Sequence, residues 1–166
     1  ATPLEVHWDN GISLVGYQML LDELPVPKAG QIVDLYWTTD REQTEAYQVH
    51  LEARPVGGGG VGPAGNISSH HVPGDWLLPT DQWPVGKVIH DRTLLRLKLE
   101  PEGTVRFLAG LRGQRPLAPT SSSRPLYRDK LVPLGDADYV EGVDGIFKTL
   151  ASRARAEQDS SQPTSS

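Results

Sequence analysis

The amino-acid sequence predicts an all-β fold, an antiparallel β-sandwich or jelly roll of about seven or eight strands with one short C-terminal helix. Apolar and polar residues alternate over several segments of strand length, most strictly over 47–54 and 105–112. Such alternation indicates strands because successive side chains of a strand point to opposite faces. Turn-forming segments separate these runs, and 17 glycines and 14 prolines suit short connections.

The first clear strand pattern covers residues 12–22. Val15, Tyr17 and Met19 are expected on one face, and Leu14 is expected on the other. Because both faces then carry apolar side chains, the pattern is typical of a central strand.

Four later segments show a simpler pattern. In 31–37, Val33, Leu35 and Trp37 share one face, with Asp34 and Tyr36 on the other, and in 47–54 apolar and polar residues alternate strictly. Residues 93–99 and 105–112 repeat the alternation. One buried and one wet face are therefore expected, above all for 47–54, which favours antiparallel pairing.

The C-terminal region changes character. We expect a β-sandwich domain over 1–138, a short amphipathic helix over 139–156 and a disordered polar tail over 157–166. The helix is predicted from apolar residues at helical spacing. These residues are Val140, Val143, Ile146, Phe147 and Leu150.

Composition excludes several classes of protein. The 166 residues include 16 basic and 21 acidic side chains, for a net charge of -5. The basic residues are scattered, so nucleic acid is not an expected partner. The chain has no cysteine, which rules out disulfides and thiolate zinc sites. No apolar run reaches the roughly 18 residues of a membrane-spanning helix, so we expect no membrane span.

Four short motifs carry a resemblance to a known family. They are Gly16-Tyr17, Val33-Asp34-Leu35-Tyr36-Trp37, Tyr47-Gln48-Val49-His50-Leu51 and the segment from Pro79 to Asp91. With them, the chain resembles the extracytoplasmic β-sandwich module at the C-terminal end of some bacterial membrane glycosyltransferases of the dolichyl-phosphate-mannose type, and of related cell-surface proteins. The resemblance covers about Leu14 to Leu134, with Lys87 where the family usually has glutamate.

This resemblance implies a companion or binding role and supplies no transferase active site. It also implies an extracytoplasmic location: secreted, periplasmic or on the cell surface. The segment Ala1-Thr2-Pro3 fits either the mature end left by signal cleavage or an arbitrary boundary of the chain.

Catalytic and metal-binding patterns are weak. The serines cluster in loop-like segments, and no Gly-x-Ser-x-Gly motif is present. His70 and His71 are adjacent, so on a strand they would point to opposite faces. A metal could in principle gather His50 and His90 with a carboxylate, but the spacing does not favour it. We therefore expect no catalytic residues, no transition-metal site and no cofactor, although a structural calcium ion remains possible.

Tryptophan residues in turn-rich segments are the best binding candidates. Trp76 and Trp83 flank Pro79-Thr80, and Trp8 precedes a turn. A flat indole ring with one N–H donor is a suitable platform for a sugar, so we assign all three tryptophans to ligand binding. For Trp83, packing against the edge of the sandwich is favoured over binding, because the tryptophan of this turn looks structural in the resembling family.

Two functions follow from these patterns, and neither is enzymatic. The first is a non-catalytic extracytoplasmic module that binds carbohydrate or positions an envelope glycosyltransferase. The second is a structural or assembly subunit of a membrane-associated protein complex. In that case the predicted helix would contact the partner through an apolar stripe. The stripe consists of Val143, Ile146, Phe147 and Leu150.

Overall fold

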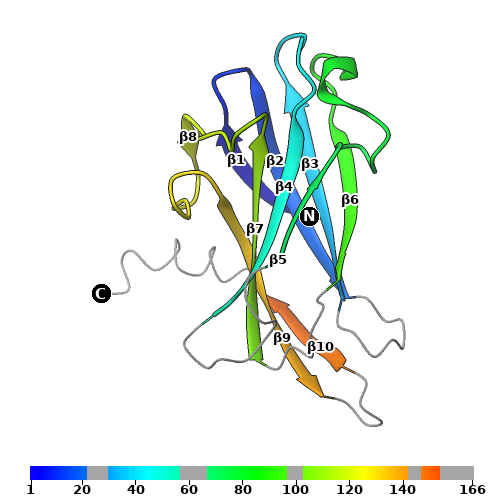
Figure 1. The fold of residues 1–166 in the computed structure, drawn as a ribbon, viewed down its shortest axis with the longest axis vertical. Helices are drawn as coiled ribbons and strands as arrows, with labels where there is room; N and C mark the ends of the chain where they lie inside the picture. Colours follow the sequence, from blue (N-terminus) through cyan, green and yellow to red (C-terminus); the bar gives the residue numbers. More distant parts are fainter. Residues whose placement is uncertain (22–29, 57–66, 97–102, 142–146, 154–166) are drawn as a thin grey trace.

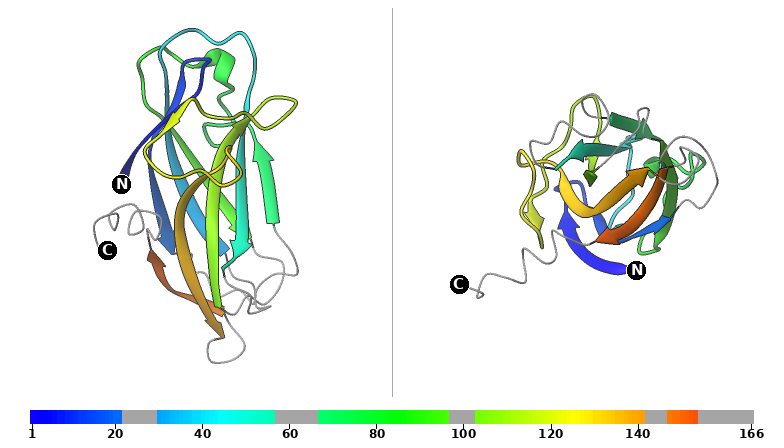
Figure 2. Two further views of the ribbon diagram at one scale, coloured as in Figure 1. Left: turned by 90° about the vertical axis from the view of Figure 1, so that its left-hand side faces the viewer. Right: turned by 90° about the horizontal axis from the view of Figure 1, so that it is seen from below.

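The computed structural model describes residues 1–21, 30–56, 67–96, 103–141 and 147–153. Two five-stranded sheets make up this part of the chain, and every strand pair in them is antiparallel. The strands run along the long axis of the molecule (Figures 1 and 2). The predicted all-β sandwich is therefore confirmed, with more strands than expected.

The first sheet has the strand order β6-β3-β2-β1-β8. Its strands are β1 (Thr2–His7), β2 (Ile12–Leu21), β3 (Gly30–Thr39), β6 (Ile89–Arg96) and β8 (Ser121–Ser122). The second sheet has the order β10-β9-β7-β4-β5. Its strands are β4 (Gln48–Pro55), β5 (Ile67–His71), β7 (Gly103–Arg112), β9 (Val132–Glu141) and β10 (Phe147–Arg153).

The edge strands β5 and β6 belong to different sheets, and the chain passes between them through residues 72–88. This connection contains the short 3-10 helix η1 (Thr80–Gln82). In Figures 1 and 2 it lies at the same end of the sandwich as the β1–β2 and β3–β4 connections. Three chain reversals therefore gather at one end.

The core lies between the sheets and follows the predicted alternation. In β3, β4 and β7 every second side chain is fully or almost fully buried. These side chains are Val33, Leu35 and Trp37 in β3, Val49, Leu51 and Ala53 in β4, and Val105, Phe107, Ala109 and Leu111 in β7. Burial of this apolar surface is the main stabilising contribution to the fold.

A β-bulge in β2 changes the faces predicted for residues 12–22. The pairing of β2 with β3 shifts register between Leu14 and Gly16. A bulge inserts one extra residue, so the alternation changes phase there. Leu14 and Tyr17 are consequently both buried in the core, although the sequence pattern placed them on opposite faces.

The helix predicted over 139–156 is wrong for the described part of that segment. Residues 139–141 belong to β9, and 147–153 form β10, which pairs with β9. A short apolar spacing pattern cannot by itself distinguish a helix from a strand, and pairing with β7 and β9 decides for strands here. Residues 142–146, with Val143 and Ile146, and the predicted tail lie outside the described residues. In the described part of the chain, no helix has the length and apolar character needed to cross a membrane.

Candidate functional site

Two of the three candidate tryptophans belong to the core. Trp8 is 3% exposed and Trp83 is 4% exposed, and both contact the ring of Trp37, with centroids 5.6 and 6.3 Å from it. Their indole N–H groups donate to the carbonyl oxygens of Leu117 and Leu78. Trp8 and Trp83 therefore pack the end of the sandwich, so the ligand-binding assignment of both residues was wrong, and the packing role favoured for Trp83 is the one observed.

Trp76 is different because 57% of its surface is exposed. It lies just after β5 in a tight turn, where Gly74, Asp75 and Trp76 all have positive φ angles, of 65°, 58° and 72°. A positive φ is ordinary for glycine and uncommon for other residues, above all for bulky ones. The chain thus presents a large aromatic side chain from a strained backbone conformation.

Hydrogen bonds hold this turn in place. Within it, Trp76 N–H donates to the Val72 carbonyl oxygen at 3.1 Å. Asp75 ties the turn to β6 in two ways. Its backbone N–H donates to Asp91 Oδ1 at 3.1 Å, and its Oδ1 accepts the backbone N–H of Arg92. The conformation of Trp76 is therefore fixed by the edge strand of the first sheet.

A buried polar cluster lies beneath Trp76. His71 at the end of β5 and Asp91 in β6 both have no exposed side-chain surface, and His71 Nε2 lies 2.6 Å from Asp91 Oδ2. Thr93 Oγ1 contacts the same nitrogen at 3.0 Å. The Trp76 ring packs on the imidazole, with centroids 5.2 Å apart. This cluster joins the edges of the two sheets and supports the exposed tryptophan.

The geometry of this cluster does not suit nucleophilic catalysis. In a catalytic triad one ring nitrogen of histidine contacts the nucleophile and the other contacts the orienting acid. Here both Asp91 and Thr93 contact Nε2, and Nδ1 of His71 is buried with no hydrogen-bond partner in the described residues. The three side chains are also buried, so a substrate could not reach the Thr93 hydroxyl in this conformation.

A second polar cluster lies on the outer face of the first sheet. Asp34 in β3 accepts two hydrogen bonds from Arg92, from Nε at 2.8 Å and from Nη2 at 2.9 Å. His90 Nε2 lies 3.0 Å from Asp34 Oδ1, and the His90 ring stacks on Tyr36. Burial alone would raise the pKa of Asp34, but hydrogen bonds from Arg92 and His90 outweigh burial and hold this pKa below its usual 3.8.

The outer face of the second sheet carries a third cluster, in a segment predicted to have a wet face. His50 is nevertheless buried, because its ring packs against His70 at 4.6 Å and its Nε2 contacts Glu52 at 2.9 Å. Arg54 pairs with the same carboxylate, and Arg112 contacts His70 Nε2. His50 Nδ1 is buried without a hydrogen-bond partner in the described residues, and the cluster presents no large exposed apolar side chain.

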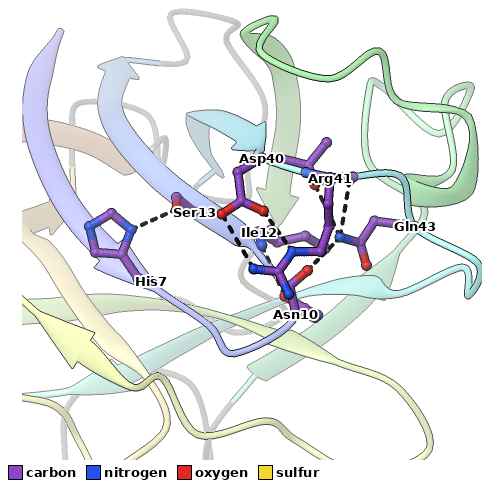
Figure 3. A network of polar contacts seen from close by, with 8 residues as sticks. His7, Asn10, Ile12, Ser13, Asp40, Arg41 and Gln43 are labelled. Carbon is purple, nitrogen blue, oxygen red and sulfur yellow. Dashed lines mark hydrogen bonds and ion pairs between the residues drawn. The ribbon is translucent and has the colours of Figure 1, made fainter.

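Figure 3 shows a polar network where the β1–β2 turn meets the segment after β3. Gln43 Nε2 donates to the Asn10 carbonyl oxygen at 2.7 Å. Gly11 has a φ of 90°, and a Cβ at this position would clash with Asp40. These contacts fix the tip of the hairpin.

The same figure contains a serine–histidine contact. His7 Nδ1 lies 2.7 Å from Ser13 Oγ across β1 and β2. A catalytic serine also needs an orienting acid on the histidine and donors for the oxyanion. In the part of the chain that the structure describes, no carboxylate hydrogen-bonds the other nitrogen of His7. We interpret this contact as a cross-strand pair that stabilises the hairpin.

Among the side chains that the structure describes, no group of three or more histidine or carboxylate residues is arranged so that it could hold a metal ion. His50 and His90 belong to different sheets and are not brought together. The structural calcium ion that the sequence left open as an alternative is not tested by these residues. Phe147 and Leu150, which the sequence placed on a helix, are residues of strand β10.

Sequence reasoning missed the pairing of Arg92 and His90 with Asp34, and that of His71 with Asp91. Asp34 and Tyr36 occupy the polar face of β3, but the sequence does not say which strand lies beside them. Only the proximity of His90 to Asp91 and Arg92 in the sequence could have drawn attention to β6. Comparisons with family models, with curated proteins and with solved structures gave no match.

Proposed function

We propose that the chain is a non-catalytic, extracytoplasmic β-sandwich module that binds carbohydrate through Trp76. The observation that carries this proposal is the exposed indole ring held on a strained and hydrogen-bonded turn. The resemblance to modules of envelope glycosyltransferases favours the same class of ligand. It also suggests a role for the module with its sugar bound, which is to position such an enzyme.

Backbone strain supports a functional role for this turn. A residue held in a sparsely populated φ/ψ region costs about 1–3 kcal/mol, and such residues cluster at ligand-binding sites. Asp75 and Trp76 are two neighbouring residues of this kind. A glycine or asparagine in place of Trp76 would relieve the strain, so the ring is kept at some cost to stability.

The chemistry of the turn suits a sugar. The indole is a large apolar face, and pyranose rings present C–H groups that stack on such a face. Asp75 beside it is exposed and offers carboxylate oxygens, which accept hydrogen bonds from hydroxyl groups. An aromatic platform with a few fixed polar groups is the usual composition of a small-molecule site.

A glycan array and titration calorimetry test the proposal. Trp76→Ala should weaken sugar binding by roughly 1–3 kcal/mol, the order expected for the loss of a stacked ring, and Trp76→Phe should retain part of the affinity. Val88→Ala is the matched control, because it removes an exposed apolar side chain from the same connection. Unchanged binding by Trp76→Ala would refute the proposal.

A second function, docking of a partner protein, is favoured by one further observation. Four of the five exposed large apolar side chains in the described residues lie in the β5–β6 connection. They are Trp76, Leu77, Val85 and Val88. If the partner is a protein of a membrane-associated complex, Leu77→Asp should abolish co-purification from membranes and leave sugar binding largely intact.

A further inference from the structure

A stacked pair of rings on the outer face of the first sheet has no role in the function proposed so far. Tyr36 in β3 and His90 in β6 are cross-strand partners, and their rings lie 5.0 Å apart at an interplanar angle of 14°. Gly16 is the partner of Tyr36 on the other side, in β2. Since glycine has no side chain, Gly16 places no side chain against the Tyr36 ring, and the Thr2 carbonyl oxygen of β1 lies beside that position.

Arg92 provides fixed hydrogen-bond donors beside this pair. The bidentate contact with Asp34 uses Nε and Nη2 of the guanidinium. Nη1 makes no hydrogen bond to any residue that the structure describes, and half of the Arg92 side chain is exposed. The N–H groups of Nη1 are therefore available in an orientation that the buried Asp34 carboxylate holds in place.

Arg92 also connects the ring pair to the Trp76 turn. Its backbone N–H donates to Asp75 Oδ1. The Asp34 carboxylate, to which its side chain is hydrogen-bonded, raises the pKa of Arg92, and Tyr36 and Asp75 add smaller effects of the same sign. In the sheet Arg92 pairs with Asp34, and the neighbouring His90 pairs with Tyr36. Arg92 is thus bonded through its backbone to the Trp76 turn and through its side chain to β3, the strand that carries Tyr36.

We propose that Tyr36, His90 and Arg92 form a second sugar subsite, continuous with Trp76, for an uncharged oligosaccharide chain. This proposal rests on the function proposed above. One sugar unit would stack on Trp76, and a neighbouring unit of the same chain would contact the Tyr36–His90 pair and accept hydrogen bonds from Arg92.

The charge of the cluster selects the class of ligand. Asp34 neutralises Arg92 through two hydrogen bonds, so the subsite offers donors without a free positive charge. A phosphate or uronate would gain little there, because an anion binds well where a cation is not already paired. Neutral hydroxyl groups need only the unoccupied donors and an apolar face.

The test uses titration calorimetry with neutral gluco-, manno- and galacto-oligosaccharides of increasing length. Trp76→Ala should weaken binding at every length. His90→Gln, which removes a ring but keeps a group able to donate to Asp34, should weaken the longer chains by roughly 3- to 10-fold and leave the shortest unchanged. Arg92→Lys, which loses the bidentate geometry, should behave like His90→Gln.

His7→Gln is the matched control, since His7 is an exposed histidine of the same sheet at the hairpin tip. It should bind all lengths like the unmodified chain, and thermal melting should show that every variant is folded. If His90→Gln and Arg92→Lys bind long chains normally while Trp76→Ala does not, the second subsite is refuted and carbohydrate binding stands. Binding confined to anionic glycans would also overturn the subsite, and no binding of any glycan would overturn both proposals.

Discussion

Individual side chains of β4 give the sharpest stability test. Val49 is fully buried and its neighbour Gln48 is exposed. Val49→Asp should destabilise the fold by about 3 kcal/mol or more, because it buries an unpaired charge, while Gln48→Asp should change stability by less than about 0.5 kcal/mol. Urea unfolding measures both values. Equal losses would mean that the two faces of β4 are assigned the wrong way round.

His70 gives a test that depends on pH. Burial, followed by the charges of His50 and Arg112, holds the pKa of His70 below its usual 6.5. Near pH 6.5 the unfolded chain therefore binds a proton that the folded chain does not. The contribution of His70 to the unfolding free energy is fully present above pH 6.5 and decreases as the pH falls below 6.5.

Replacing His70 with glutamine removes this proton uptake. We expect the unfolding free energy of His70→Gln to fall less than that of the unmodified chain between about pH 7.5 and about pH 5.5. An identical fall in both proteins would show that His70 does not contribute.

The tryptophans show how far sequence reasoning reaches at the scale of a residue. Trp8, Trp76 and Trp83 all follow or precede turn-forming residues, so local sequence treats them alike. Trp8 and Trp83 are buried because their rings pack against Trp37 of β3, whereas the exposed Trp76 packs on His71. Exposure of an aromatic residue in a connection is therefore a tertiary property that one sequence does not reveal.

Edge strands β5 and β6 are joined through the buried His71–Asp91 contact, and this link can be tested by substitution. Asp91→Ala leaves His71 and the Asp75 N–H without their acceptor, so it should destabilise the fold by about 3 kcal/mol or more. Thr93→Val keeps the shape and removes only the longer contact, so it should cost about 1 kcal/mol.

The double variant separates the interaction from other effects. Adding His71→Phe to Asp91→Ala should cost less than the sum of the single changes, with a coupling of about 1–3 kcal/mol. Strict additivity in thermal or urea unfolding would argue against a direct His71–Asp91 interaction.

Element boundaries were predictable where alternation was uninterrupted. In β3, β4 and β7 the residues predicted to face the core are buried, although Asp34, His50 and Leu108 on the opposite faces are buried as well. The bulge in β2 could not be foreseen, because it depends on the register with β3. The C-terminal strands β9 and β10 were missed for a similar reason, since the pairing of β9 with β7 and of β10 with β9 outweighs the helical spacing of a few apolar residues.

For the molecule as a whole, paired carboxylates on both sheets predict sensitivity to acid. Burial alone would raise the pKa of Glu52, but hydrogen bonds from His50 and Arg54 outweigh it and lower this pKa below its usual 4.5, as happens to Asp34 on the other sheet. A lowered carboxyl pKa stabilises the fold above the unfolded value, and the contribution is lost as the pH falls through the folded value.

Asp34→Asn and Glu52→Gln should therefore be less stable than the unmodified chain at neutral pH, and the difference should narrow below about pH 4. Guanidinium unfolding at several pH values measures this. Asp81→Asn, an exposed residue of η1, serves as the control and should follow the unmodified chain throughout. A difference that stays constant with pH would contradict the predicted contribution of these carboxylates.

The assignment of strands to sheets was beyond the sequence, and the candidate site depends on it. Asp75 and Tyr36 are far apart in the chain, and β6 links them because Arg92 is hydrogen-bonded to Asp75 while the nearby His90 pairs with Tyr36 of β3. Alternation predicted the class of fold and the core. Which strands lie side by side is determined only when the two sheets close into the sandwich.

The contact between His71 and Asp91 has a consequence for how the sandwich opens. Edge strands usually fray independently, but here the His71–Asp91 hydrogen bond connects β5, at the edge of one sheet, to β6, at the edge of the other. Amide protons of β5 and β6 should therefore exchange with solvent as one cooperative unit, although the two strands belong to different sheets. A substitution at Asp91 in β6 should accelerate exchange in β5 as well.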